Sequence, residues 1–287
     1  MRCPTPETIV RDKISNTVPC GKCVFCLGNR RTEWAFRLNE EMKVATTGHF
    51  LTLTYADEYV PVTEDGELTL SKKDIRDFIK RLRWNIYLEW MNTFTSEEIV
   101  LKWPLKRPTI KYYLTGEYGT ETHRPHYHAI TFNVSQEIMR DMANIWKKGN
   151  IKIGTVTPLS INYVTKYLIS DIEDTSTKEK TFSWMSNKIG EHYLEANHKL
   201  HKNLKRDYAI NQNGQKTRLP RYYKDKIFNI KEREALRENK IELSDKLYWQ
   251  EYARIKKLGD DPFKYHQEQL KQNVARLKKN ANKNNTL

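Results

Sequence analysis

The chain has 287 residues, of which 38% are hydrophobic and 30% are charged, so it is long enough and apolar enough to bury a core. Lys and Arg number 50 against 36 Asp and Glu, a net charge of +14, and such a surplus favours a polyanionic partner because each neutralised phosphate releases counterions. No apolar run approaches the ~20 residues that span a bilayer, and the N-terminus lacks a signal-peptide stretch, so we expect a cytoplasmic protein with no membrane partner.

The first 30 residues form a segment that contains every cysteine of the chain: Cys3, Cys20, Cys23 and Cys26. A reducing compartment argues against disulfides. Four thiolates suit a tetrahedral structural zinc, although an iron–sulfur centre has similar demands and unligated thiols are the third alternative. We expect a zinc ion that pins the N-terminus and takes no part in catalysis.

The next residues predict a helix, a strand and a second helix. The spacing of Trp34, Leu38 and Met42 predicts a helix over residues 30–46, and alternating residues at 50–55 predict a strand. After a polar turn at 64–66, Ser71 is a good N-cap for a helix. Apolar residues keep helical spacing from that cap as far as Trp90, so this helix should pack on an apolar surface.

Further along, strands are expected at 110–118 and 126–132, followed by a helix over 136–148 that ends at Gly149. A short strand at 151–156 precedes a helix that Ser160 would cap and that would run to residue 169. The mixture has no regular βαβ rhythm, which favours the α+β class with an antiparallel sheet. From residue 230 the pattern is charged and helical, and its Lys- and Asn-rich end is expected to be disordered.

His126 and His128 carry the first chemical signal. Side chains alternate along a strand, so both imidazoles point to one face, ~7 Å apart at the backbone, and they can converge on one cation. Two half-buried histidines with hydrogen-bond partners are the alternative explanation. Glu117 lies on the preceding strand, and the eight residues between it and His126 allow a hairpin. His123 is a reserve ligand, but its separation from His126 places it in the turn.

Two His and one carboxylate suit a divalent cation that acts as a Lewis acid on a phosphate. Mg²⁺ prefers oxygen ligands, so Mn²⁺ fits two imidazoles better, and zinc is a further alternative.

Tyr163, Lys166 and Tyr167 form the second signal, because residues i, i+3 and i+4 share one face of a helix. Phenol has a pKa of ~10, so a tyrosine nucleophile needs a nearby cation or a polarised phosphate. Lys166 could fill that role beside Tyr163, which we therefore expect to attack first. Plain packing is the alternative for the tyrosine pair. Together with the histidines, these residues supply what a phosphodiester transesterase requires.

At these residues the sequence resembles the HUH endonuclease superfamily, and more closely the replication initiators of gokushovirus-type microviruses. The three family motifs occur in chain order, at residues 50–57, 126–128 and 163–167. Stretches at 18–26, 182–186 and 219–226 also match, so the resemblance covers roughly residues 3–229.

The resemblance implies a central antiparallel sheet of about five strands flanked by helices, with His126 and His128 on a middle strand. It implies that one tyrosine attacks single-stranded DNA at the viral origin, leaving a 5′-phosphotyrosine and a free 3′-hydroxyl for the host polymerase. The second tyrosine would attack the regenerated origin, and the displaced strand would be closed into a circle. The phosphotyrosine conserves the bond energy, so no ATP is needed. The chain has no Gly-x-x-x-x-Gly-Lys-Ser/Thr run, so unwinding would need a host helicase.

Three candidate DNA contacts follow from the same motifs: Thr52, Thr54 and Arg124. The implied organisation is a Cys-rich segment at 1–30, an HUH endonuclease domain at 31–229 and a helical basic tail at 230–287, acting in the cytoplasm of a bacterial host. One rival hypothesis is a non-catalytic nucleic-acid-binding protein whose tyrosines stack on bases. Another is a metallohydrolase that uses water and needs no tyrosine.

Overall fold

The computed structural model of the chain describes residues 3–11, 14–95, 98, 108–119, 121–166, 178–211 and 214–282. Two compact units are present. We call one the sheet unit (Leu38–Tyr167 with Glu173–Gly190) and the other the terminal unit (Met1–Arg37, Leu168–Ile172 and Glu191–Leu287). Compact units are not the same as domains, so the division predicted at residues 30 and 229 stays a prediction.

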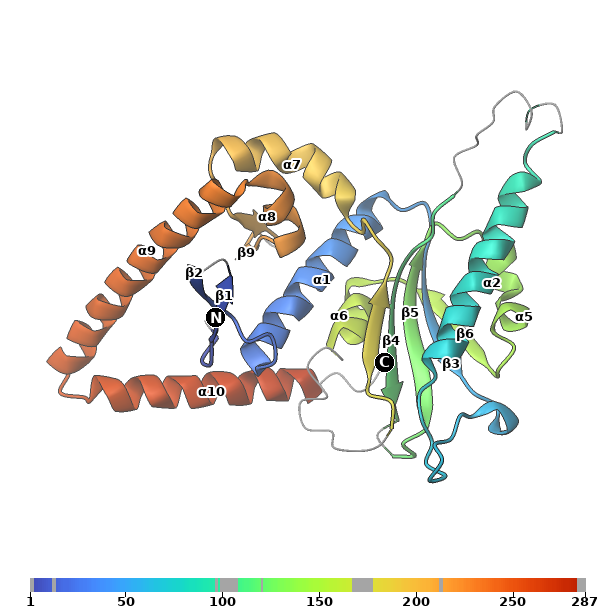
Figure 1. Cartoon of the computed structure of the whole chain (residues 1–287), viewed down its shortest axis with the longest axis horizontal. Coiled ribbons are helices and arrows are strands. Elements are labelled where there is room, and N and C mark those ends of the chain that lie inside the picture. Colours follow the sequence, from blue (N-terminus) through green and yellow to red (C-terminus); the bar gives the residue numbers. More distant parts are fainter. Residues whose placement is uncertain are drawn as a thin grey trace. The chain divides into compact units, whose positions relative to one another are not determined.

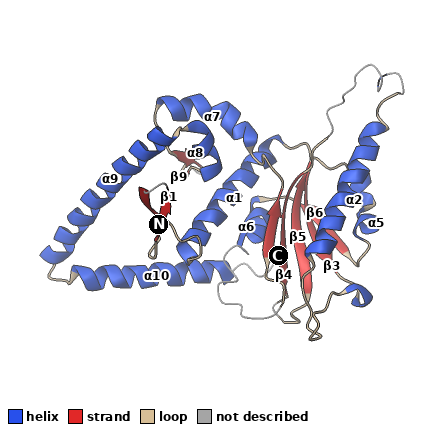
Figure 2. Ribbon diagram, viewed as in Figure 1, coloured by secondary structure: helices blue, strands red, loops and turns tan. Residues whose placement is uncertain are grey.

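The sheet unit is built on five antiparallel strands in the order β6-β3-β5-β4-β7 (Figures 1 and 2). Their bounds are Gly48–Thr54 for β3, Lys111–Tyr118 for β4, Pro125–Phe132 for β5, Ile151–Thr155 for β6 and Phe182–Met185 for β7. The α+β class, the five antiparallel strands and the central position of the histidine strand are therefore confirmed.

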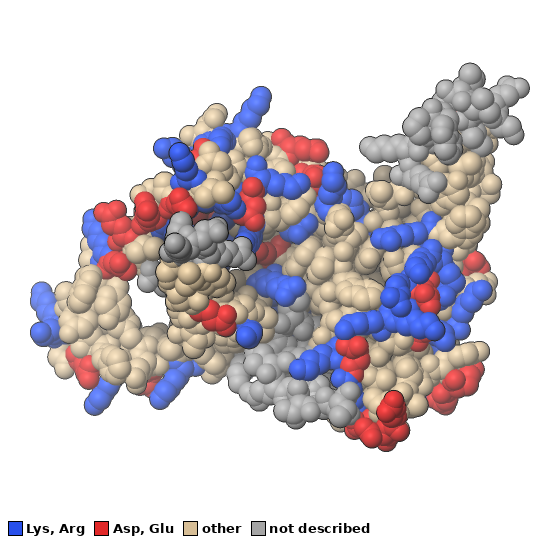
Figure 3. Space-filling model, in the orientation of Figure 1, with Lys and Arg blue, Asp and Glu red and all other residues tan. Residues whose placement is uncertain are grey.

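One face of the sheet packs against helices α2 (Lys72–Met91), α4 (Gln136–Arg140) and α5 (Met142–Trp146). The core on this face joins Leu53 of β3, Tyr127 of β5, Phe78 of α2 and Trp146 of α5, all fully buried. The outer face of α2 is basic: Lys and Arg side chains gather over this helix in the view of Figure 3. Helix α6 (Pro158–Lys166) lies on the opposite side of the sheet (Figure 1).

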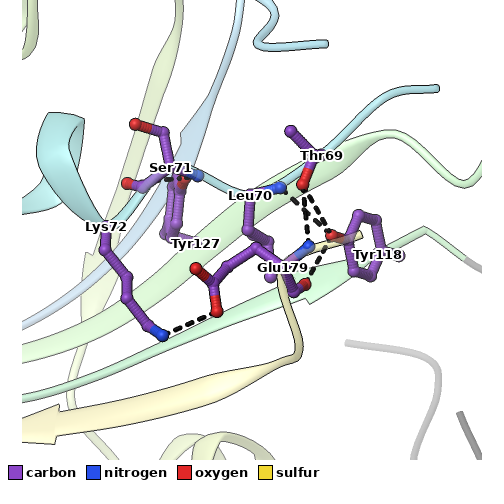
Figure 4. A network of polar contacts seen from close by, with 7 residues as sticks. All are labelled: Thr69, Leu70, Ser71, Lys72, Tyr118, Tyr127 and Glu179. Carbon is purple, nitrogen blue, oxygen red and sulfur yellow. Dashed lines mark hydrogen bonds and ion pairs between the residues drawn. The ribbon is translucent and has the colours of Figure 1, made fainter. Parts of the chain in front are cut away.

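Polar contacts fix the start of α2 against the sheet (Figure 4). The Ser71 hydroxyl accepts a hydrogen bond from the Asp74 amide at 3.1 Å, which confirms the predicted N-cap. The Ser71 amide donates to the Tyr127 hydroxyl at 2.8 Å, and the Lys72 ammonium pairs with Glu179 at 2.6 Å. The Tyr118 hydroxyl donates to the Glu179 carbonyl at 2.7 Å. The loop before α2 and the ends of β4 and β5 are thus tied together.

Three predicted helices differ from those observed. Helix α1 spans Val24–Val44, so it begins six residues before the predicted start, within the cysteine segment. The helix expected over 136–148 is two short ones, α4 and α5, separated at Asp141. Ser160 lies inside α6, and the Thr157 hydroxyl accepts from the Ser160 amide at 3.1 Å, so Thr157 provides the cap. Residues 167–169 of that prediction lie outside the described part of the chain.

The terminal unit joins both ends of the chain. Its elements are β1 (Glu7–Arg11), β2 (Ile14–Val18), the first part of α1, α7 (Glu191–Asn203), β8 (Tyr208–Ile210), β9 (Lys216–Arg218), α8 (Arg221–Ile227), α9 (Ile230–Lys257) and α10 (Pro262–Asn282). Its core packs Phe36 edge-on against Tyr193 and Tyr223. The helical C-terminal region is confirmed, while residues 283–287, within the end expected to be disordered, are not among those described. No helix in the described ranges has the length and apolar character to cross a bilayer.

Candidate metal centre and tyrosine helix

Glu117, His126 and His128 meet on the α6 side of the sheet. Strands β4 and β5 pair antiparallel with Glu117 opposite His126, so the predicted hairpin and the shared face are both observed. Glu117 Oε1 lies 2.8 Å from Nε2 of His126 and 2.8 Å from Nε2 of His128. The three ligand atoms lie within 4.8 Å of one another, which is a spacing that one divalent cation can bridge.

The other ring nitrogen of each histidine has its own partner. Nδ1 of His126 lies 3.1 Å from the Arg124 carbonyl oxygen, so it carries the proton. Nδ1 of His128 lies 3.0 Å from the Thr52 hydroxyl oxygen. Both contacts leave Nε2 as the ligand atom, and such outer hydrogen bonds orient metal-binding imidazoles in proteins.

Burial and charge set the protonation of this group. Burial alone would raise the pKa of Glu117, but its hydrogen bonds with both imidazoles outweigh burial and lower that pKa. Burial lowers the pKa of His128. For His126 burial acts in the same direction, yet the hydrogen bond and charge of Glu117 outweigh it and raise the pKa. A charged carboxylate and a neutral His128 are the protonation states that bind metal.

Tyr163 of α6 points at this group. Its hydroxyl lies 3.4 Å from Nε2 of His128, and its ring packs edge-on against Phe50 with centroids 6.1 Å apart. Phe50 also stacks on His128 at 5.5 Å. Nζ of the buried Lys166 lies 4.0 Å from the centroid of the Tyr163 ring. A hydroxyl nucleophile, a cation and a metal-ligand group therefore share one site.

The remaining predicted site residues fall in different places. Tyr167 lies outside the described residues. His123 is exposed in the turn with φ of 50° and does not join the ligand group. Arg124 pairs with Asp57 at 2.7 Å, and the Thr54 hydroxyl donates to the Asn150 carbonyl at 3.2 Å.

Sequence reasoning missed two supporting roles, the stacking of Phe50 and the bond from Thr52 to His128. The alternation of β3 was the available signal, because residues 50, 52 and 54 face the same side as the histidines.

The four cysteines of the terminal unit also converge. Their sulfur atoms all lie within 4.8 Å of one another. The Sγ atom of Cys3 lies 3.4 Å from that of Cys20 and 3.7 Å from that of Cys23, and Cys20 lies 4.0 Å from Cys26. Two backbone amides point at sulfur: that of Cys20 donates to Cys3 and that of Cys23 to Cys20, both at 3.4 Å.

Fold and site together define an α+β protein whose antiparallel sheet carries a Glu–His–His ligand group beside a tyrosine. The family model of the replication-associated protein ORF2 matches residues 48–172, a range that holds every element of this site. The chain is 30% identical over 242 residues to the replication-associated protein VP4 of Bdellovibrio phage phiMH2K, with 76% of this chain and 70% of that protein covered. The chain belongs to this family of phage replication-associated proteins.

Two other relatives show the same similarity. Replication-associated protein ORF2 of Spiroplasma virus 4 is 31% identical over 170 residues, which cover 54% of this chain and 48% of that protein. Replication-associated protein ORF4 of Chlamydia phage 1 is 25% identical over 241 residues, covering 74% and 54%. The chain thus spans about half the length of these two relatives.

Among solved structures, the N-terminal nuclease domain of the minute virus of mice non-structural protein 1 aligns with 58% of this chain and 83% of that chain. Its sequence identity is 12% and its TM-score is 0.20, so this likeness adds nothing to the argument.

Proposed function

We propose that this chain initiates rolling-circle replication by nicking and rejoining single-stranded origin DNA through a tyrosine nucleophile. The observation that carries the proposal is the position of the Tyr163 hydroxyl, 3.4 Å from Nε2 of His128 in the Glu–His–His group. Membership of the replication-associated family gives this geometry its context. The place of action would be the cytoplasm of a bacterial host.

The proposed chemistry is one exchange of phosphate esters. The Tyr163 oxygen forms a bond to phosphorus while the bond from phosphorus to the 3′ oxygen breaks. The phenolic proton passes to a base and the departing 3′ oxygen takes up a proton, so the products are a 5′-phosphotyrosine and a 3′-hydroxyl. The Lys166 ammonium beside the ring would stabilise the phenolate before attack.

The donor set fits a divalent cation. Glu117, His126 and His128 would hold it, because their three ligand atoms converge and both Nδ1 atoms are occupied by other partners. When bound, Mn²⁺ or Mg²⁺ would supply Lewis-acid polarisation of the scissile phosphate. Two imidazoles favour Mn²⁺. No ATP enters the reaction.

Tyr167 would serve as the second nucleophile that closes the circle, four residues after Tyr163 on the helical pattern. The free 3′-hydroxyl would prime the host polymerase, and a host helicase would unwind the duplex.

The test is a cleavage assay on labelled single-stranded origin DNA, with and without Mn²⁺, resolved on a denaturing protein gel. We expect a metal-dependent band of DNA-linked protein that disappears in the variant carrying both Tyr163→Phe and Tyr167→Phe. Tyr163→Phe alone should abolish the first cleavage, whereas Tyr87→Phe on α2 serves as the matched control and should leave it intact.

Two outcomes would reject the proposal. DNA binding without an adduct would leave a nucleic-acid-binding protein. Metal-dependent cleavage that survives in the double variant would leave a metallohydrolase that uses water.

We further propose that Cys3, Cys20, Cys23 and Cys26 hold a structural zinc ion. A tetrahedron with Zn–S bonds of ~2.3 Å separates its sulfur atoms by about 3.8 Å, and the observed separations of 3.4, 3.7 and 4.0 Å surround this value. The two amide-to-sulfur bonds match the outer contacts that orient metal ligands.

Elemental analysis of the purified chain tests this proposal. We expect one zinc per chain in the wild type and in His126→Ala, and loss of zinc in Cys23→Ser. Iron with acid-labile sulfide, or a metal-free chain that melts like the wild type, would contradict it.

A further inference from the structure

The terminal unit contains a cavity of about 1070 Å³. Its walls come from the end of the β1–β2 hairpin, from α8 and from one face of α9 (Figure 1). This cavity belongs to the unit that does not contain the histidines, and the proposed nicking chemistry does not use it.

The cavity has an excess of positive charge. Six of its lining side chains are basic: Arg218, Arg221, Lys224, Arg233, Arg237 and Lys240. Three carboxylates accompany them. Asp225 pairs with both Arg221 and Arg233, Asp207 pairs with both Lys224 and Lys240, and Glu33 pairs with Arg218. Six cations and three carboxylates leave three positive charges in excess.

Arg237 and Lys240 are the accessible members of this set. The Arg237 guanidinium donates to the Thr17 carbonyl oxygen at 3.0 Å, and no carboxylate of the described residues lies within ion-pair distance of it. The Lys240 side chain is 56% exposed. Burial lowers the pKa of Lys224, and the nearby charge of Lys240 lowers it further, as expected where cations crowd together.

Helix α9 continues this basic face with aromatic rings. Arg237, Ser244 and Tyr248 recur at helical spacing, so they follow one stripe of the helix. Tyr248 is 46% exposed and the adjacent Trp249 is 62% exposed. The cavity thus offers cations for phosphates, and the same helix offers ring faces on which unpaired bases can stack.

We propose that this cavity and the α9 stripe form a second binding site for single-stranded DNA, which holds the backbone phosphates at Arg237 and Lys240 and a base on Tyr248. The inference rests on the proposed function for the identity of the polyanion. Single-stranded DNA fits better than duplex, because a paired base presents no free face to an aromatic ring.

The test is a binding titration of the full chain with a fluorescent single-stranded oligonucleotide, without added divalent cation, over a series of salt concentrations. The variant carrying Arg237→Gln and Lys240→Gln should bind about ten-fold more weakly. Its dependence of log affinity on log salt should flatten by about 1.4, since each lost phosphate contact removes ~0.7. Tyr248→Ala should weaken binding about five-fold or more with the salt slope unchanged.

Two controls isolate the site. Lys246→Gln removes an exposed lysine of α9 that does not line the cavity, and it should bind like the wild type. Exchange of the two cations, Arg237→Lys with Lys240→Arg, keeps the charge and should also retain the affinity, which shows that a neutral variant fails through charge rather than through misfolding.

The outcomes separate this inference from the nickase proposal. Unchanged affinity and salt slope in the double Gln variant would overturn the second site even if wild-type protein forms the covalent adduct. Equal competition by poly-glutamate, with no effect of Tyr248→Ala, would overturn it in favour of an acidic peptide. Weaker DNA binding in the double Gln variant and in Tyr248→Ala would support the second site even if no adduct forms.

Discussion

At the scale of single residues, the candidate metal centre depends on hydrogen bonds made one layer outside it. Thr52 contacts no predicted reacting atom, yet its hydroxyl lies 3.0 Å from Nδ1 of His128. This bond selects the tautomer in which Nε2 is the free ligand atom. Partners of this kind typically contribute about 10- to 100-fold to metal affinity, so a residue expected to touch DNA has a positioning role in the structure.

Replacement of Thr52 by Val should therefore weaken Mn²⁺ binding by about 10- to 100-fold, measured by titration calorimetry without DNA. Val is well suited to a strand, so melting should change little. Thr54→Val is the matched control, because the Thr54 hydroxyl bonds the Asn150 carbonyl and no histidine. Equal Mn²⁺ affinity in the two variants, with DNA affinity lost only in Thr52→Val, would instead make Thr52 a DNA contact.

The site residues were predictable to different degrees. The alternation of side chains along a strand placed His126, His128 and Glu117 on one face before any coordinates, and the structure brings their ligand atoms together. The role of Thr52 was not predictable, because the pairing of β3 with β5 sets it and no local pattern specifies which neighbour a hydroxyl meets.

At the scale of elements, the connection after α5 is held against the end of β3. Gly149 has φ of 148°, and a Cβ atom there would lie 2.3 Å from the Ala56 nitrogen and 2.4 Å from the Thr54 oxygen. The Ala56 amide donates to the Lys148 carbonyl oxygen at 2.9 Å. Only glycine allows the two backbones to approach this closely.

Gly149→Ala should accordingly lower the free energy of unfolding by about 3 kcal/mol or more, through the clash and the strained φ. Gly66→Ala is the control: its φ of 80° is also positive, but nothing lies within 4 Å of the added Cβ, so the loss should be about 1 kcal/mol. Urea unfolding compares the two. Similar losses would mean that the loop moves away from β3 without cost.

Helix α7 ends on a buried histidine that should make stability depend on pH. His201 is fully buried, its Nε2 lies 2.9 Å from the Tyr193 hydroxyl, and burial holds its pKa below the usual value. The unfolded chain therefore binds a proton that the folded chain refuses, and stability falls as the pH drops through about 6.5.

His201→Gln removes this proton linkage. The melting temperature of the wild type should exceed that of the variant at pH 7.5, and the difference should shrink by pH 5.5. His198→Gln, on the same helix, controls for the loss of an imidazole and should show a difference that does not vary with pH. A constant gap for His201→Gln would show that His201 carries no proton linkage.

The elements themselves were predictable where a local pattern existed. Strands β3, β4 and β5 lie within two residues of their predicted bounds, because buried and exposed positions alternate or the run is apolar. The short strands β1, β2, β7, β8 and β9 were not predicted. Each has five residues or fewer, and such segments pair through their surroundings rather than through their own composition.

At the scale of the whole molecule, the terminal unit depends on contacts between distant parts of the sequence. Phe36 packs against Tyr193 and Tyr223, and Val24 and Phe25 pack with Val274 and Leu277. No local pattern encodes such pairs, which is why the resemblance and the periodicity suggested a separate tail. The described elements of α9 and α10 instead complete the unit that begins at the N-terminus.

This arrangement makes the cysteine cluster the fastening point of the terminal unit. The β1–β2 hairpin has two strands of five residues, and a two-stranded hairpin is marginal alone in water. The cluster joins Cys3 before β1 and Cys20 after β2 to Cys23 and Cys26 at the start of α1. A metal ion held by all four thiolates would contribute its binding free energy directly to this fold.

Removal of zinc should therefore unfold one region of the chain and spare another. By hydrogen exchange, the metal-free chain should lose protection in β1, β2 and the first turn of α1, while β3, β4 and β5 keep theirs. His126→Ala, which disables the other ligand group, should keep protection in β1 and β2. If the hairpin stays protected without metal, the packing of Val24 and Phe25 on α10 is sufficient. In that case the thiols are buried side chains rather than ligands.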